Sequence, residues 1–271
     1  EALKCLCQMQ ADGVSPDFVT LSSALKACHT IGAIHKGREM HAEIVRKGYE
    51  GNLFAHSTLV DLYARCGLLV EAKDVFHELP AQDVVSWNTL ITNYVEHGYG
   101  EEALFFFEQM QLKGIPPDAI TYISSLKGSG SIGSMNRSQK LHIEVIERGL
   151  ENYSSIGNTL VDTYAKCGSM IEACEVFDKL LAQSVVSWTA LIAGYVQQEK
   201  NEEAFRCFGQ MRNEGICGDT VTFACILKAC GNTGAIEKGE QIYNEIINMF
   251  RDSLHKNLVL GTALVDMYAK C

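Results

Sequence analysis

Apolar side chains recur along this chain with the spacing of paired α-helices. Within residues 84–118 they follow the i, i+3, i+4, i+7 pattern of one helix face, at Trp87, Leu90, Ile91 and Tyr94. Gly98 then permits a turn, and the same period returns over residues 103–110. One antiparallel pair cannot bury both of its apolar stripes, so the pattern predicts that successive pairs stack into an all-α solenoid.

The helical pattern is part of a longer repeat in the amino-acid sequence. TLVDLYARCG begins at residue 58, TLVDTYAKCG at residue 159 and TALVDMYAKC at residue 262. VVSWNTLITNYV from residue 84 likewise matches VVSWTALIAGYV from residue 185, which sets a period of 101 residues. Each period divides into repeats of 35, 35 and 31 residues, and each repeat predicts one helix pair.

Pro16-Asp17 and Pro117-Asp118 set the boundaries between repeats. The predicted repeats cover residues 1–17, 18–52, 53–83, 84–118, 119–153, 154–184, 185–219, 220–257 and 258–271. The repeat 220–257 is longer than its equivalents, which predicts an insertion near Phe250 to His255. The chain begins and ends within helical patterns, so we expect a fragment of a longer repeat tract, with any targeting segment outside it.

Composition narrows the possible functions. The chain is 47% hydrophobic and 21% charged, and no apolar run reaches the roughly 18 residues of a membrane span. The eleven cysteines form no C-x-x-C motif, and several, such as Cys66 and Cys167, occupy equivalent repeat positions. We therefore expect free thiols, no metal site and no cofactor. The net charge of −10 argues against a nucleic-acid partner, because phosphate binding depends on Lys and Arg.

The letters of the repeats resemble a known family. VVSWNTLITNYVEHGYGEEALFFFEQMQLKGIPPD (84–118), EALKCLCQMQADGVSPD (1–17) and EEAFRCFGQMRNEGICGD (202–219) resemble pentatricopeptide repeats. The 35-35-31 order is similar to the P, L and S repeats of the plant PLS class. By this resemblance the P-type repeats are 1–17, 84–118 and 185–219, the L-type are 18–52, 119–153 and 220–257, and the S-type are 53–83, 154–184 and 258–271.

The resemblance implies a right-handed α-solenoid superhelix that binds single-stranded RNA. It implies the RNA-recognition tract of an organellar RNA processing or C-to-U editing factor, in a plant mitochondrion or chloroplast. A deaminase, or a domain that recruits one, is expected beyond the fragment, and no enzyme activity, membrane partner or small-molecule substrate is expected within it.

In the family that the chain resembles, the fifth and last residues of a repeat contact one base, and the second residue packs on base faces. The implied reading pairs are Ser57 with Asp83 for guanine, Asn88 with Asp118 for uracil, Asn158 with Ser184 for cytosine and Thr189 with Asp219 for guanine, followed by Thr262 in the truncated last repeat. The implied packing residues are Phe54, Val85, Val186 and Val259.

A helical projection gives the same surface independently. It places the fourth, seventh, eighth and eleventh residues of a repeat toward the core, and the second, fifth, ninth, twelfth and thirteenth on another face. The cations on that face, which we expect to contact phosphates, are Lys26, Arg65, Lys127, Lys166, Lys228 and Lys270. The acidic excess falls largely in second helices, so we expect a locally basic surface with modest, strongly salt-dependent affinity.

The L-type repeats depart from the family's reading pattern. Their fifth and last residues are Ser22 with Asn52, Ile123 with Tyr153, and Ala224 with Asn257. We expect these repeats to tolerate any base, which gives a core site 5′-GUNCG-3′, and to offer a surface for accessory editing-factor proteins.

Two alternatives stay open. Asp at the start of a helix is a common N-cap, which would make the role of Asp17, Asp83, Asp118 and Asp219 structural alone. The array would otherwise be a protein-binding scaffold, in which apolar L-type positions such as Ile123 engage a partner protein.

Two motifs resemble catalytic signatures without their context. Residues 128–133 fit G-x-G-x-x-G, but they fall between two predicted helices rather than after a strand. His41-Ala42-Glu43 and the matching text at His142 fit half of a zinc deaminase motif, but the P-C-x-x-C half is absent. The third copy carries Tyr243 instead of His, so we expect a structural role for this position.

Overall fold

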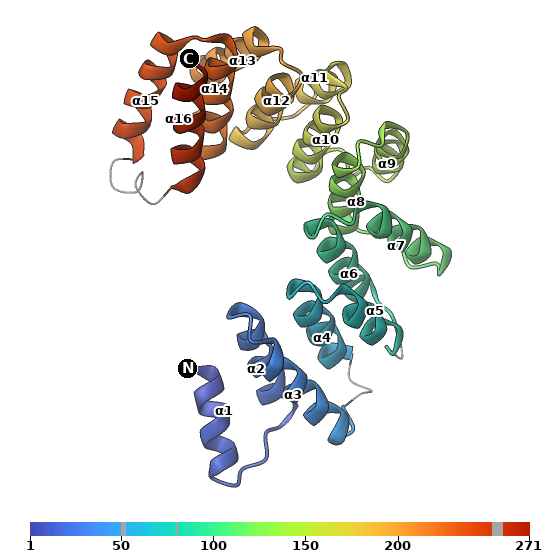
Figure 1. Cartoon of the computed structure of the whole chain (residues 1–271). Helices are drawn as coiled ribbons and strands as arrows, with labels where there is room; N and C mark the ends of the chain where they lie inside the picture. Colours follow the sequence, from blue (N-terminus) through green and yellow to red (C-terminus); the bar gives the residue numbers. More distant parts are fainter. Residues whose placement is uncertain (50–52, 80, 251–256) are drawn as a thin grey trace. The chain divides into compact units, whose positions relative to one another are not determined.

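The computed structural model describes residues 1–49, 53–79, 81–250 and 257–271. These residues form sixteen α-helices and no strand, and the helices of each pair run antiparallel (Figure 1). No helix in these ranges is both long and apolar enough to cross a membrane. The predicted all-α architecture of helix pairs is confirmed.

The chain divides into two units, of which the first covers Glu1–Gly128. Its helices are α1 (Ala2–Ala11), α2 (Phe18–Thr30), α3 (Ile34–Arg46), α4 (Leu53–Arg65), α5 (Leu69–His77), α6 (Val84–Glu96), α7 (Gly100–Leu112) and most of α8 (Ala119–Ser131). Within this unit the first helices of successive pairs, α2, α4 and α6, pack on one another in order. They form one layer, which the second helices cover.

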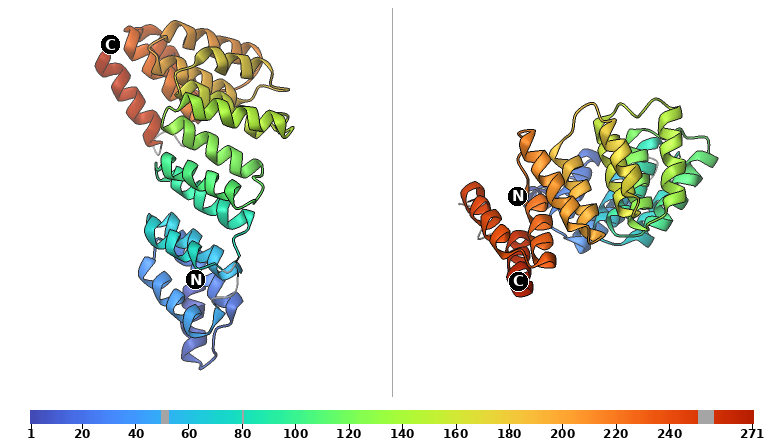
Figure 2. Two further views of the ribbon diagram at one scale, coloured as in Figure 1. Left: turned by 90° about the vertical axis from the view of Figure 1, so that its right-hand side faces the viewer. Right: turned by 90° about the horizontal axis from the view of Figure 1, so that it is seen from above.

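The second unit covers Ser129–Cys271. Its complete helices are α9 (Met135–Glu147), α10 (Ser154–Lys166), α11 (Met170–Asp178), α12 (Val185–Gln197), α13 (Asn201–Asn213), α14 (Thr220–Thr233), α15 (Ile236–Phe250) and α16 (Leu258–Lys270). Here α10, α12, α14 and α16 pack in order, so the same layer of first helices recurs, as the two further views show (Figure 2).

Aromatic contacts hold each pair to the next. Trp87 of α6 is 2% exposed and meets Phe76 of α5 edge-on, with ring centroids 4.7 Å apart. The equivalent rings of Trp188 and Phe177 lie 4.6 Å apart in the second unit. Because both residues of each contact occupy predicted core positions of the repeat, the packing follows from the apolar period.

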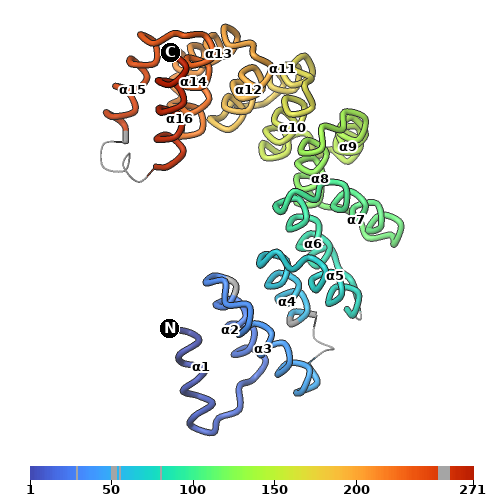
Figure 3. Tube along the Cα trace, viewed as in Figure 1, coloured from blue at the N-terminus to red at the C-terminus, as the bar shows by residue number. Residues whose placement is uncertain are grey.

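The reversal inside each pair depends on a residue with left-handed backbone, seen as a tight bend of the trace in Figure 3. Gly98 provides it after α6, with φ of 83°. The equivalent residue after α12 is Glu199, with φ of 60°, and it is the one non-glycine residue with positive φ in the described ranges. A side chain in this conformation is sterically disfavoured, so this turn is strained where Gly98 is not.

The first helices of the pairs begin where the predicted repeats begin. The first residue of each predicted repeat after the initial fragment is the first residue of a helix, at Phe18, Leu53, Val84, Ala119, Ser154, Val185, Thr220 and Leu258. The order of P, L and S types stays a prediction. Asn52, and the part of the predicted insertion that covers residues 251–255, lie outside the described residues.

Candidate nucleic-acid interface

In six of the predicted repeats the side chain of the last residue caps the first helix of the next repeat. Asp83 accepts a hydrogen bond from the backbone N–H of Ser86 at 2.9 Å, and Asp219 accepts one from Thr222 at 2.8 Å. Ser184 and Asn257 cap α12 and α16 in the same way. These side chains therefore act as helix N-caps within the fold, as the N-cap alternative predicted. Some of them have further partners across the repeat.

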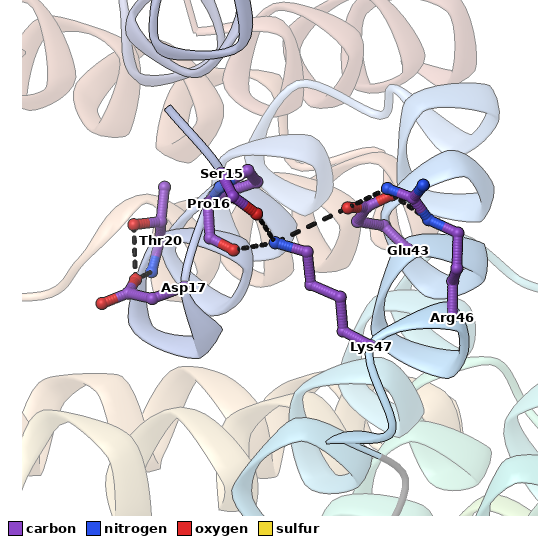
Figure 4. Close-up of polar contacts among 7 residues, drawn as sticks. All are labelled: Ser15, Pro16, Asp17, Thr20, Glu43, Arg46 and Lys47. Carbon is purple, nitrogen blue, oxygen red and sulfur yellow. Dashed lines mark hydrogen bonds and ion pairs between the residues drawn. The ribbon is translucent and has the colours of Figure 1, made fainter. Parts of the chain in front are cut away.

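Figure 4 shows the cap at Asp17 together with the chain segment that leads to it. The Asp17 carboxylate accepts from the backbone N–H of Thr20 at 2.8 Å and from its hydroxyl at 2.6 Å. These bonds lower the pKa of Asp17 below its ordinary value. Lys47 donates to the Ser15 hydroxyl at 2.6 Å and to the Pro16 carbonyl, so the segment before α2 is tied to the end of α3.

The predicted pair of repeat 84–118 is in direct contact. Asn88 Nδ2 lies 3.0 Å from Asp118 Oδ1 and 3.1 Å from Asp118 Oδ2, although the residues are 30 positions apart. Asp118 Oδ1 also accepts from the backbone N–H of Thr121 at 2.9 Å, so the capping carboxylate and the fifth residue form one unit. Partial burial raises the pKa of Asp118, but hydrogen bonds from Thr121 and Asn88 outweigh this effect and hold the pKa below its ordinary value.

The predicted pair of repeat 185–219 is joined through a third residue. Thr189 Oγ1 lies 2.6 Å from Thr222 Oγ1, and Thr222 Oγ1 donates to Asp219 Oδ1 at 2.8 Å. A hydroxyl carries one hydrogen, so Thr222 gives its proton to Asp219 and receives that of Thr189. The Thr189 oxygen is left to act as an acceptor.

The predicted residues of repeat 53–83 line one hollow of about 390 Å³. Ser57 and Asp83 lie in its wall together with Phe54 and Val85, the second residues of two successive repeats. Lys26 stands at the same hollow, with Nζ 5.1 Å from the centre of the Phe54 ring. With Thr58 and Asp61, which also line it, two hydroxyls, two carboxylates, a cation and two exposed apolar side chains converge at this hollow.

Repeat 154–184 differs from repeats 84–118 and 185–219, because the described residues show no bond that joins its pair. Asn158 Oδ1 is buried and has no hydrogen-bond partner among the described residues. The hydroxyl of Ser187, which accepts from the Ser184 N–H at 2.9 Å, donates back to the Ser184 carbonyl at 3.0 Å. A buried acceptor without a partner is costly, and among the described residues no hydrogen bond to Oδ1 holds the Asn158 amide in place.

The second residue is an exposed apolar side chain in each predicted repeat after residue 17 except 154–184, where it is Ser155. The predicted packing residues Phe54, Val85, Val186 and Val259 are 52% to 57% exposed. Three further exposed second residues, Val19, Ile120 and Val221, lie in L-type repeats and were missed by the sequence analysis, although the repeat register identifies them. Each stands at the start of a first helix, beside the fifth residue of its repeat.

The cations of the predicted surface fall into two groups. Lys26, Lys127 and Lys228, at the ninth position, are exposed. Each cation at the thirteenth position is paired with the Asp four residues before it: Arg65 with Asp61 at 2.6 Å, Lys166 with Asp162 at 2.7 Å and Lys270 with Asp266 at 2.7 Å. The surface is therefore less basic than the cation count suggests, because three of six positive charges have a carboxylate partner.

The remaining predicted positions are less organised. Thr262 is exposed and donates to the Leu258 carbonyl at 2.8 Å. Among L-type residues, Tyr153 is 53% exposed, whereas Ser22 is buried and its hydroxyl has no partner in the described residues. These repeats show no bonded pair of fifth and last residues in the part of the chain that the structure describes.

The residues that resemble a deaminase motif have structural partners. His41 Nδ1 and His142 Nδ1 each lie 2.8 Å from a tyrosine hydroxyl, of Tyr63 and Tyr164 respectively. Burial, with a smaller effect of Lys179, lowers the pKa of His142. Residues 128–133 lie at the end of α8 and in the turn that follows. No group of three or more His, Cys, Asp or Glu side chains suited to a metal occurs among the described residues.

Comparison with known proteins gives a consistent result. A family model described as the PPR repeat family matches residues 82–130 and 183–232, and a PPR repeat model matches residues 54–84 and 158–185. The chloroplastic pentatricopeptide repeat-containing protein At4g25270 of Arabidopsis thaliana is 37% identical over 90% of the chain, and At1g11290, also chloroplastic, is 32% identical over all of it. The chain spans 45% and 33% of the lengths of these two relatives.

A solved structure shares the fold. The crystal structure of the pentatricopeptide repeat protein PPR10 in complex with an 18-nucleotide psaJ RNA element aligns with a TM-score of 0.69 at 20% identity. The alignment covers 99% of this chain and 38% of that protein. At this identity the likeness shows the fold alone.

Proposed function

Because this chain belongs to the pentatricopeptide repeat family, we propose that it binds single-stranded RNA, with one base to each repeat that carries a complete reading pair. The observation that carries the proposal is the contact of Asn88 with Asp118 at 3.0 Å. Helix packing alone would be served by apolar side chains here, whereas an amide and a carboxylate at a partly exposed junction can satisfy the edge of a base.

The expected core site is 5′-GUNCG-3′, read by the repeats 53–83, 84–118, 119–153, 154–184 and 185–219. Supporting this assignment, no hydrogen bond to Asn158 Oδ1 holds the amide among the described residues, so the amide is able to turn this oxygen toward the amino group of cytosine. Thr189 and Asp219 both present acceptors, which suit the two N–H donors of guanine.

The electrostatics support binding through few phosphates. The thirteenth-position cations are neutralised by Asp partners, and the net charge is −10. Hydrogen bonds to bases and packing on the exposed second residues must then supply much of the affinity. The remaining contacts with phosphates make the affinity decrease as the salt concentration rises.

The context of the whole protein is part of the proposal. The 35-35-31 order supports the PLS class, and the names of several relatives carry the word chloroplastic. We place the chain in an organelle, as the recognition tract of an RNA processing or C-to-U editing factor. L-type repeats, whose described residues show no bonded pair, would space the bases or bind accessory editing-factor proteins.

A double substitution tests the base assignment. The changes Asn158→Thr and Ser184→Asp recreate the pair of repeat 185–219 within repeat 154–184. We expect the preferred base at that position to change from C to G, measured by fluorescence anisotropy with GUNCG and GUNGG oligonucleotides at one stated ionic strength. Equal affinity of the unaltered chain for both oligonucleotides would contradict the assignment.

A protein-binding scaffold is the second candidate. The ion pairs that neutralise the thirteenth-position cations favour it, because they reduce attraction for phosphate. The anisotropy measurement separates the two candidates, since a scaffold would show no sequence-dependent RNA binding at any salt concentration.

A further inference from the structure

A buried hydroxyl stands behind two of the predicted base-reading pairs. Thr121 and Thr222 are the third residues of their repeats, and both are 0% exposed. Each reaches back across the repeat boundary to the fifth residue of the preceding repeat. Thr121 Oγ1 lies 2.6 Å from Asn88 Oδ1 and 2.9 Å from Asp118 Oδ1. The hydroxyl carries one hydrogen, and Asp118 Oδ1 already accepts from the Thr121 N–H and the Asn88 amide, so the hydroxyl donates to Asn88 Oδ1. Thr222 Oγ1 lies 2.6 Å from Thr189 Oγ1.

The hydroxyl decides which end of the Asn88 amide is available. With its carbonyl held by Thr121 and its amino group directed at Asp118, the amide has only its second N–H to offer a base. A flipped amide would turn its carbonyl oxygen toward the Asp118 carboxylate, which is electrostatically unfavourable. An outward N–H donor matches the carbonyl groups of uracil and opposes the amino group of cytosine.

Asn158 provides the natural contrast. It is the fifth residue of its repeat, as Asn88 is, but the hydroxyl of Ser187 behind it bonds to Ser184 instead. The Asn158 carbonyl consequently has no internal partner. The Asn carbonyl is thus held in one repeat and not held in the other, according to where the third-position hydroxyl is directed. Only the amide that is not held is able to turn its oxygen toward a base.

Thr222 fixes the hydrogen-bonding direction of the Thr189 hydroxyl in the same way. Thr222 donates to Asp219, so Thr189 must donate to Thr222, and its own oxygen is left as an acceptor. Without the Thr222 hydroxyl, the Thr189 hydroxyl could rotate and either donate or accept a hydrogen bond. The repeat would then discriminate less between guanine and adenine.

We propose that Thr121 and Thr222 are positioning residues for specificity, which fix the hydrogen-bonding polarity of Asn88 and Thr189 toward the base. The inference rests on the proposed RNA-binding function and adds a third residue, contributed by the following repeat, to the reading unit. It requires no direct contact between either threonine and RNA, since both are fully buried.

The experiment compares matched oligonucleotides for each variant of the 271-residue chain. GUNCG and GCNCG report on Asn88, and GUNCG and GUNCA report on Thr189. Loss of one positioning hydrogen bond should reduce the U over C preference of Thr121→Val about tenfold and leave its G over A preference unchanged. Thr222→Val should reduce the G over A preference about tenfold and leave the U over C preference unchanged. Thr121→Ser keeps the hydroxyl and should retain the preference for U.

Ser187→Ala is the matched control, because it removes a capping hydroxyl whose hydrogen bonds among the described residues go to Ser184 alone. It should lower stability while preserving the C preference of repeat 154–184. Unchanged preferences in both Val variants would overturn the proposal while the proposed function stands. If the unaltered chain shows no preference at any of these bases, the proposed function fails and this inference fails with it. Circular dichroism melting identifies a variant that does not fold, in which case the other Val variant decides.

Discussion

Replacing Asp61, Asp162 and Asp266 with Asn removes the carboxylate beside each thirteenth-position cation. The paired side chains are between 32% and 48% exposed, so water already screens the attraction in each pair. Exposed i, i+4 pairs of this kind are worth about 0.3–0.5 kcal/mol each, so the triple variant should lose roughly 1–1.5 kcal/mol of unfolding free energy in total and remain folded.

The effect on RNA binding should be larger than the effect on stability. Each freed cation can displace one counterion from a phosphate, and for single strands the slope of log K against log salt changes by about 0.7 per phosphate. The triple variant should therefore bind more tightly at low salt, and its slope should steepen by up to about 2. Affinity for GUNCG measured by anisotropy at a series of NaCl concentrations gives the slope directly.

A matched control makes the same charge change away from the predicted surface. Glu39, Glu71 and Glu203 lie on second helices and pair with Lys36, Arg38 and Arg206. Changing these three Glu to Gln adds the same net charge, and we expect only a small change in slope because the groups lie on second helices and not on the predicted surface of the first helices. Equal slopes for the two triple variants, or an unchanged slope for the Asp variant, would refute the reasoning.

Two further predictions concern the stability of the fold. Glu199→Gly should raise the unfolding free energy by about 1 kcal/mol in urea titrations, because φ of 60° strains any residue with a Cβ; Gly98→Ala should lower it, and opposite signs would argue against strain at this turn. Burial lowers the pKa of His142, so below its ordinary value of 6.5 the unfolded chain takes up a proton that the folded chain resists. Unfolding free energy should thus fall as pH drops through 6.5, and His142→Gln should flatten this dependence in urea titrations at pH 7.5 and 5.5; an unaltered dependence would assign it to other groups.

The apolar period was sufficient to predict the helices, because the chain contains three copies of the 101-residue pattern, the first and last of them incomplete. The fourth and eleventh positions, such as Trp87 and Tyr94, lie in the core as the 100° rotation per residue requires. The predicted surface is less simple. Asn88 and Thr189 are each only 8% exposed, although the projection grouped them with the outer face. A projection gives direction but not depth, and depth depends on how closely the next repeat packs.

Other contacts at the candidate interface depend on folding in three dimensions. The pairing of Asp61 with Arg65 could have been anticipated from i, i+4 spacing, and it changes the expected electrostatics of the surface. The link from Thr121 to Asn88 could not, because it joins residues 33 positions apart across a repeat boundary. The capping role of Asp118 was among the alternatives, but a single sequence cannot show that one carboxylate serves both a helix end and an amide.

The position of Thr121 has a consequence for the construction of artificial arrays. If specificity were confined to a repeat as the letters delimit it, a module could be cut between Asp118 and Ala119 and grafted elsewhere. The Asn88, Asp118 and Thr121 trio spans that joint, so such a cut leaves the orienting hydroxyl behind in the donor protein. A joint placed after Thr121 would transplant the complete proposed reading unit, and the transferable module is then a repeat shifted by three residues.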